Sequence, residues 1–228
     1  MSNDNMNESL AYAKAHKDEF VKRLIMNKSI SEDKFAIFMA GSPGAGKSEV
    51  ATSLIELVDH NLVRIDADEF RIAFPGYKGD NSSDFQKGAS WLVDHSLTLL
   101  LKQGYSFILD GTFAISKASK NIERALGRDY DVTIYYVYQD PIIAWQFTKA
   151  REDKEGRVVP KERFINAYFR SRENIKNVKQ MFGDEVELNI VMKDYQNNIT
   201  EIHFDTDHVG LFLPEKYTIE ELEEKLND

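Results

Sequence analysis

Short apolar runs alternate along most of the chain with longer stretches of helical periodicity. Five runs rich in β-branched and aromatic residues predict strands over residues 35–40, 62–65, 107–109, 132–138 and 186–192. The stretches between them predict helices over residues 47–58, 84–102, 116–126, 142–152 and 161–181. Continuous apolar strands separated by helices indicate a mainly parallel sheet that is covered on both faces.

The two ends of the chain add elements to this core. Residues 6–26 predict an N-terminal helix, because their apolar side chains recur at near-helical spacing. After residue 192, a turn at Asn197 and Asn198 predicts an antiparallel edge strand. Residues 218–226 predict a polar helix that is capped by Thr218. We therefore expect one α/β domain over residues 35–228, with residues 1–34 as an N-terminal helical extension.

Composition narrows the functional classes. The chain has 228 residues, no cysteine and a formal net charge of −9. Without cysteine it has no disulfide, no thiolate nucleophile and no Cys-ligated zinc, which fits a reducing cytosol. It has no apolar run near the roughly 20 residues of a membrane helix and no secretory signal at its start, so we expect no membrane association. The negative charge argues against long nucleic acids but not against a small anion held by a local cluster.

The sequence GSPGAGKS at residues 41–48 matches the phosphate-loop pattern G-x-x-x-x-G-K-S/T, between a predicted strand and a predicted helix. Its glycines let backbone N–H groups point inward around an anion, and the helix N-terminus adds its dipole. Lys47 is expected to reach the β- and γ-phosphates of ATP, and Ser48 to hold Mg²⁺. The predicted nucleotide-binding residues are Gly41, Ser42, Pro43, Gly44, Ala45, Gly46, Lys47, Ser48 and Glu49. The fold expected is a P-loop NTPase or kinase-like three-layer sandwich.

Among phosphate-loop proteins, the features of this chain favour a kinase. A GTP switch needs an Asn-Lys-x-Asp stretch, but Lys193 and Asp194 are not preceded by asparagine. Motor ATPases usually have longer chains. A phosphotransferase remains, with a second substrate opposite the γ-phosphate.

Carboxylates at predicted strand ends supply candidate chemistry. Asp66 and Asp68 close the second strand, where one of them can accept the proton of an attacking hydroxyl and the other can cap the next helix. Asp110 ends the third strand, where it can bind the Mg²⁺ shell through water, bind the substrate or lie in solvent. Thr112 follows in the same crevice.

Arginines follow the fourth strand in a segment that resembles the lid of small kinases. Arg151 and Arg157 can close over the phosphates and stabilise charge during transfer. The alternative is a basic surface stretch that nearby acidic residues balance.

Four motifs in order resemble the zeta toxin family of P-loop kinases over most of residues 35–182. They are GSPGAGKS, IDADEF at 65–70, GYSFILDGTF at 104–113, and Arg151 followed by GRVVP at 156–160. The resemblance implies ATP- and Mg²⁺-dependent phosphorylation of the 3′-hydroxyl of UDP-N-acetylglucosamine. It also implies a toxin in the bacterial cytoplasm that a small antitoxin holds silent.

The resemblance assigns roles to individual residues. It implies that Asp68 is the general base, which leaves Asp66 structural, and that Asp94 contacts the sugar. Asp110 departs from the pattern, because the family often has glutamate there. The expected catalytic residues are Lys47, Asp68, Arg151 and Arg157, and the expected substrate contacts are Asp94, Asp110 and Thr112.

Two alternatives stay open. The acceptor could be another molecule, such as NAD, a nucleoside or a polynucleotide end, because residues 70–95 are least constrained by the resemblance. The chain could also be a nucleotide-binding interaction module with weak catalysis, which loss of Asp68 would not impair.

Overall fold

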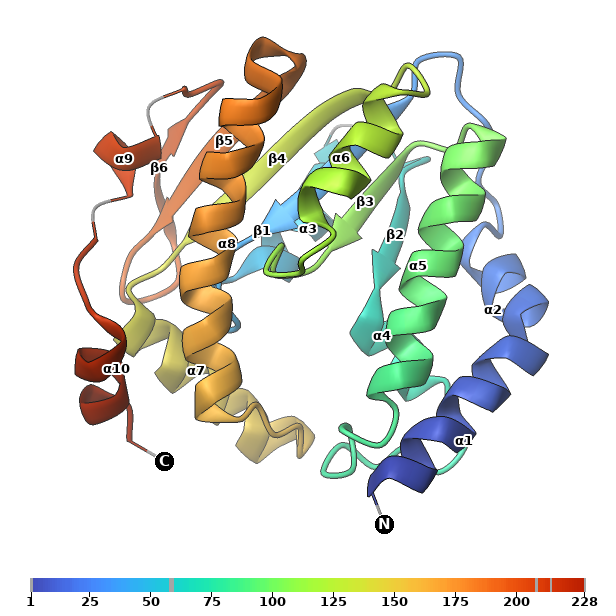
Figure 1. The fold of residues 1–228 in the computed structure, drawn as a ribbon, viewed down its shortest axis with the longest axis horizontal. Helices are drawn as coiled ribbons and strands as arrows, with labels where there is room; N and C mark the ends of the chain where they lie inside the picture. The colour runs from blue at the N-terminus through green and yellow to red at the C-terminus, as the bar shows by residue number, and fades with distance from the viewer. Residues whose placement is uncertain (1, 58–59, 208, 214, 228) are drawn as a thin grey trace.

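A computed structural model of the chain describes all residues except 1, 58–59, 208, 214 and 228 (Figure 1). Six strands form one sheet in the order β2-β3-β1-β4-β5-β6. All neighbours are parallel except β5 and β6, which are antiparallel, so the fold prediction is confirmed. The strands are β1 (Phe35–Ala40), β2 (Val63–Asp66), β3 (Phe107–Asp110), β4 (Asp131–Tyr138), β5 (Val186–Lys193) and β6 (Ile199–His203).

Helices cover both faces of this sheet, with α5, α6 and α8 in front of it in Figure 1 and α3 behind it. The helices of the main body are α3 (Lys47–Leu57), α4 (Ala67–Ile72), α5 (Gln86–Gln103), α6 (Ala118–Leu126), α7 (Pro141–Glu155) and α8 (Lys161–Phe182). Those at the ends are α1 (Ser2–Ala15), α2 (Lys17–Leu24), the 3-10 helix η1 (Gly183–Glu185), α9 (Val209–Phe212) and α10 (Ile219–Lys225).

The central strand β1 shows why both faces must be covered. Ala36 and Phe38 point into the larger core, which α5, α6 and α8 close. Ile37 and Met39 point into the smaller core, which includes Val50 of α3. Since alternate side chains of a strand face opposite sides, an unbroken apolar run needs an apolar layer on each side.

The ends of the chain differ in part from the prediction. The single helix expected over residues 6–26 is wrong, because the helix breaks at His16 into α1 and α2. The His16 ring stacks on Tyr12 with centroids 4.1 Å apart, and its Nδ1 lies 3.2 Å from a Glu19 carboxylate oxygen. At the other end, Thr218 caps α10 as predicted, by accepting a hydrogen bond from Glu221 N.

The N-terminal helices pack on the main body rather than standing apart from it. Ala13 and Phe20 lie in the larger core, and α1 runs along α5 (Figure 1). Gly88 of α5 lets the two helices approach closely, since a Cβ there would lie 2.6 Å from the Ser9 carbonyl oxygen. Among the described helices, none combines the length and apolar character that crossing a bilayer requires.

Candidate active site

The phosphate loop lies between the turn after β3 and helix α7. Gly41, directly after β1, donates its N–H to the Thr112 carbonyl oxygen at 3.2 Å. Gly44 has φ +74°, and a Cβ at that position would overlap the Ala144 carbonyl oxygen. Only glycine tolerates both the left-handed backbone and this close approach. The loop thus has the tight, left-handed glycine backbone that is typical of a phosphate nest.

Lys47 begins α3 and is buried beside this loop, with its Nζ donating to the Ser42 carbonyl oxygen at 2.6 Å. Burial lowers the pKa of Lys47 to about 8, although the nearby carboxylate of Asp110 partly opposes that fall. No carboxylate in the described part of the chain lies within ion-pairing distance of Lys47. A buried ammonium without a counter-ion, at the start of a helix and next to the Ser48 hydroxyl, fits a bound polyphosphate and its metal ion.

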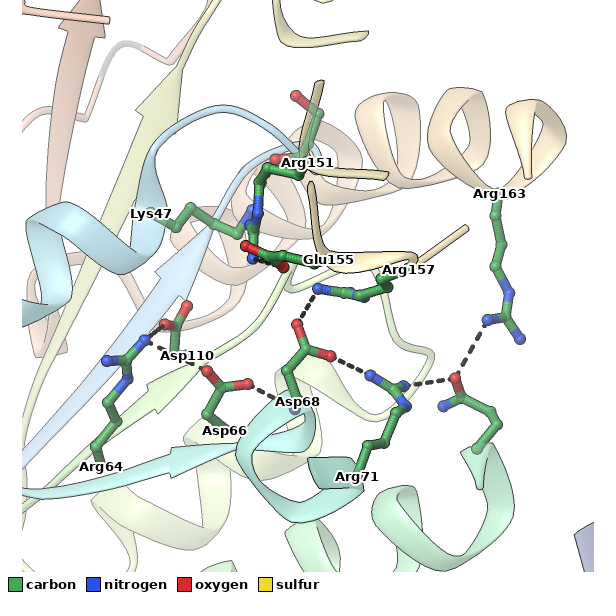
Figure 2. Close-up of polar contacts among 12 residues, drawn as sticks. Lys47, Arg64, Asp66, Asp68, Arg71, Asp110, Arg151, Glu155, Arg157 and Arg163 are labelled. Atoms are coloured by element: carbon green, nitrogen blue, oxygen red, sulfur yellow. Dashed lines mark hydrogen bonds and ion pairs between the residues drawn. The ribbon is translucent and has the colours of Figure 1, made fainter. Parts of the chain in front are cut away.

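The paired carboxylates after β2 have different surroundings. Asp66 caps α4, because its Oδ1 accepts a hydrogen bond from Asp68 N at 2.8 Å. Burial, together with the charges of Asp68 and Asp110, raises the pKa of Asp66 to about 6. Asp68 instead projects from the first turn of α4 toward the phosphate loop (Figure 2).

Asp68 is held by two arginines from different elements. Arg71, one turn further along α4, bonds one carboxylate oxygen, and Arg157, from the segment after α7, bonds the other (Figure 2). Arg71 also donates to the side-chain oxygen of Gln86 at 2.7 Å. The carboxylate is therefore fixed in orientation while 30% of its side chain stays exposed.

Asp110 ends β3 directly opposite Asp66 in the sheet register. Its carboxylate accepts a hydrogen bond from Arg64 Nη2 at 2.6 Å, and the same nitrogen lies 3.3 Å from Asp66 Oδ2. Burial alone would lower the pKa of Arg64, but Asp110 and Asp66 outweigh it and raise the pKa. A magnesium-bound water at Asp110 would therefore share this carboxylate with Arg64.

The family of the protein follows from a comparison with known proteins, since a model of the zeta toxin family matches residues 18–208. The chain belongs to the zeta toxin family. A comparison of the chain with curated protein sequences found no match. The range that matches the family model begins inside α2 and includes every residue of the site described above.

Solved structures share the fold of this zeta toxin family member at low sequence identity. One is a chain of the PezAT chromosomal toxin–antitoxin system of the human pathogen Streptococcus pneumoniae, with a TM-score of 0.70, 18% identity, and coverage of 95% of this chain and 96% of that one. Another is the native AvrRxo1-ORF1:-ORF2 complex, with a TM-score of 0.61, 11% identity, and coverage of 100% and 79%. The AvrRxo1-ORF1:-ORF2 structure with ATP has a TM-score of 0.58, 11% identity, and coverage of 92% and 70%.

The zeta toxin fold brings most of the expected site residues together. Asp110, Arg157, Asp68 and Arg151 are the charged groups that act on Lys47, and Figure 2 shows them around it. Arg151 is paired with Glu155 on the same helix at 3.3 Å.

Two expected substrate contacts lie at the border of this cluster. Thr112 abuts the phosphate loop through its carbonyl oxygen. Asp94 lies on α5, and its half-exposed carboxylate faces Lys117 at 3.4 Å and Arg124 at 3.9 Å. Neither ion pair reaches the Lys47–Asp68 cluster, and the role of Asp94 in the zeta toxin site stays a prediction.

Four polar residues of the zeta toxin site were not predicted from the sequence: Arg64, Arg71, Gln86 and Arg163. Arg64 stands two residues before Asp66 on a strand and therefore shares its face. Arg71 stands three residues after Asp68 on a helix, which is contact spacing. Both spacings were visible in the sequence. The contact between Arg163 and Gln86 spans 77 positions, and no local pattern indicates it.

Proposed function

We propose that this protein transfers the γ-phosphate of ATP to a sugar hydroxyl of a nucleotide sugar, most specifically the 3′-hydroxyl of UDP-N-acetylglucosamine. The observation that carries the proposal is the position of Asp68, a partly exposed carboxylate fixed by two arginines beside the phosphate loop. A base in that position takes the proton of a hydroxyl that attacks the γ-phosphate.

The proposed transfer uses the residues of the site in distinct roles. The acceptor oxygen bonds to the γ-phosphorus, the bond from that phosphorus to the oxygen bridging it to the β-phosphate breaks, and ADP leaves. Asp68 receives the hydroxyl proton. Lys47, Arg151 and Arg157 neutralise charge that spreads over the phosphate oxygens.

ATP and Mg²⁺ are the cofactors that suit these groups. The glycine-rich loop and Lys47 would hold the phosphates, with residues 41–49 forming the nucleotide site. Ser48 would hold the metal ion, and Asp110 would reach it through water. Bound Mg²⁺ supplies charge that offsets the phosphate oxygens. The structure described with ATP, which shares this fold, favours ATP as the nucleotide.

The biological role that we propose is that of a toxin in the bacterial cytoplasm, with a small antitoxin protein as its partner. The family match supports this role, and so do two proteins of similar fold, one from the PezAT chromosomal toxin–antitoxin system and one in the AvrRxo1-ORF1:-ORF2 complex. We place the kinase domain at residues 35–228, with residues 1–34 as an extension that packs on α5. Asp94, Asp110 and Thr112 are the proposed acceptor contacts.

The test is a transfer assay with ATP, Mg²⁺ and a panel of nucleotide sugars, NAD and nucleosides, in which a gain of one phosphate is detected by mass. Asp68→Asn should lower kcat by about 10²- to 10⁴-fold, because the amide keeps the shape of the carboxylate but cannot take a proton. The affinity for ATP should stay equal or become tighter, since the change releases two arginines. Calorimetry measures that affinity.

Asp66→Asn is the matched control, because asparagine also caps helices and the rate should fall little. A large loss in Asp66→Asn with none in Asp68→Asn would reverse the assignment of the base. Equal rates in both variants and the wild type would contradict proton transfer by either carboxylate.

A further inference from the structure

On the side of Asp68 that faces away from the phosphate loop, the site holds more positively than negatively charged groups. Arg71, Arg157 and Arg163 converge from α4, from the segment after α7 and from α8 (Figure 2). Asp68 is the carboxylate paired with the first two, and Arg163 has no ion pair within the described residues. Within the described residues these three guanidinium groups thus have one carboxylate as an ion-pair partner, in a protein whose net charge is −9.

A single neutral oxygen joins two of these cations. The Gln86 side-chain oxygen accepts from Arg71 Nη2 at 2.7 Å and from Arg163 Nη1 at 3.2 Å. An amide oxygen carries only a partial charge, so it offsets little of the repulsion between two full positive charges. An anionic oxygen in its place would satisfy both guanidinium groups more strongly.

Arg71 has unused hydrogen-bonding capacity at this point. The residue is buried, with 7% of its surface exposed, and its Nε has no hydrogen-bond partner among the described residues. Burial lowers the pKa of Arg71, Asp68 opposes that fall, and the charges of Arg157 and Arg163 add to it. A buried guanidinium with a free N–H and cationic neighbours is stabilised by an added anion.

Two long helices also begin here. Gln86 is the first residue of α5, and Arg163 lies in the first turn of α8. Neither helix has a side-chain cap at its N-terminus; α5 has no acidic residue in its first turn, and α8 has Glu162 there, next to Arg163. Helix N-termini carry positive partial charge and favour anions, so an arginine in the first turn of α8 adds charge where an anion is preferred.

We propose that Arg71 and Arg163, bridged by Gln86, form a second anion subsite that binds a phosphate group carried by the acceptor. The inference rests on the proposed phosphotransfer to a nucleotide sugar and adds to it the residues that hold the acceptor's own phosphate. Arg71 touches both Asp68 and Gln86, so a phosphate held here stands one guanidinium group away from the proposed base. Free sugars and nucleosides lack the group that this subsite takes.

Pyrophosphate binding to the full-length protein tests the subsite without requiring any transfer. The phosphate loop is first saturated with a non-hydrolysable ATP analogue and Mg²⁺, and inorganic pyrophosphate is then titrated by calorimetry. We expect pyrophosphate to bind the wild type and to bind Arg163→Gln about 10- to 100-fold more weakly, as loss of a charge-assisted hydrogen bond predicts. Arg170→Gln, an exposed position on the same helix, is the matched control and should bind like the wild type.

A second readout follows if transfer to UDP-N-acetylglucosamine is observed. Arg163→Gln should then raise KM for UDP-N-acetylglucosamine by a similar factor, with kcat and KM for ATP close to those of the wild type. If the wild type does not phosphorylate this acceptor, the proposed function fails, while pyrophosphate binding that depends on Arg163 still supports the subsite. The proposed subsite is overturned if pyrophosphate does not bind to the wild type saturated with the ATP analogue, or if it binds equally well to Arg163→Gln.

Discussion

Replacing Lys47 with methionine should abolish phosphotransfer and yet stabilise the nucleotide-free protein. Methionine approximates the length of lysine without the charge. Lys47 is buried, with 9% of the residue exposed, and within the described part of the chain its side chain makes one hydrogen bond, to the Ser42 carbonyl oxygen. The charge therefore opposes folding until phosphate is bound.

The size of this effect follows from the pKa of Lys47. A fall from 10.5 to about 8 corresponds to roughly 3 kcal/mol of unfavourable free energy at neutral pH. The loss of the hydrogen bond from Lys47 to Ser42 reduces this gain in stability by about 1 kcal/mol. The free energy of unfolding of Lys47→Met should therefore exceed that of the wild type by about 2 kcal/mol at pH 7.

The dependence on pH has a definite sign. The pKa of Lys47 is lower in the folded state, so the unfolded chain holds more protons between about pH 8 and 10.5. The free energy of unfolding of the wild type then rises with pH in that window, by up to about 1.4 kcal/mol per unit. The advantage of Lys47→Met should be full below pH 8 and nearly gone at about pH 9.5.

Urea denaturation at pH 7 and pH 9.5 measures this difference, with Lys120→Met as the control at an exposed position on α6. Added ATP and Mg²⁺ should stabilise the wild type and leave Lys47→Met almost unchanged. A variant that is less stable than the wild type at pH 7, or whose advantage does not change with pH, would refute the reasoning. Lys47 would then contribute packing or hydrogen bonding that outweighs its buried charge.

Two further substitutions test the local geometry. Asp66→Asn should keep the α4 cap and raise the free energy of unfolding by up to about 3 kcal/mol above pH 6, because the pKa of Asp66 lies near 6 in the folded state rather than at 3.8. The folded state holds that proton more tightly, so the gain should vanish as pH falls to about 4, which urea denaturation at both pH values checks. Gly44→Ala should lower the melting temperature and weaken ATP binding by calorimetry, since its Cβ overlaps the Ala144 oxygen at φ +74°. Wild-type behaviour of Gly44→Ala would mean that the loop does not adopt this backbone.

Elements with a strong local signal were predicted well from the sequence. The strand expected over residues 35–40 is β1 with the same bounds, because an unbroken apolar run buried on both faces has few alternatives. The antiparallel edge strand β6 was predicted from a turn, and Asn197 adopts φ 66° there, a conformation that asparagine tolerates. The helix expected over residues 47–58 is α3, which ends at Leu57, and residue 58 lies outside the described residues.

Features set by contacts across the fold were not predicted. The helix breaks at His16, whose ring stacks on Tyr12, and periodicity alone does not show this break. The short helix α9 was not expected, because four residues are too few for a periodic signal. In the site, Asp66 and Asp68 were identified as a pair from their place at a predicted strand end, and the family resemblance singled out Asp68. One of the two arginines that hold Asp68 is Arg157, 89 positions away in the sequence. The pairing of Asp68 with Arg157 depends on how the segments that follow β2 and α7 are placed relative to each other in the fold.

Net charge and local charge restrict the partner in different ways. At −9 overall, the surface repels an extended polyanion, whose binding needs many cations spread along one face. The positive groups are instead concentrated around Lys47 and Asp68, where Arg71, Arg151 and Arg157 come from three separate segments. A cluster of that size can neutralise the few phosphates of one or two small molecules. The same chain can therefore be acidic as a whole and still favour two phosphorylated substrates side by side, which is the charge distribution that transfer from ATP to a nucleotide sugar requires.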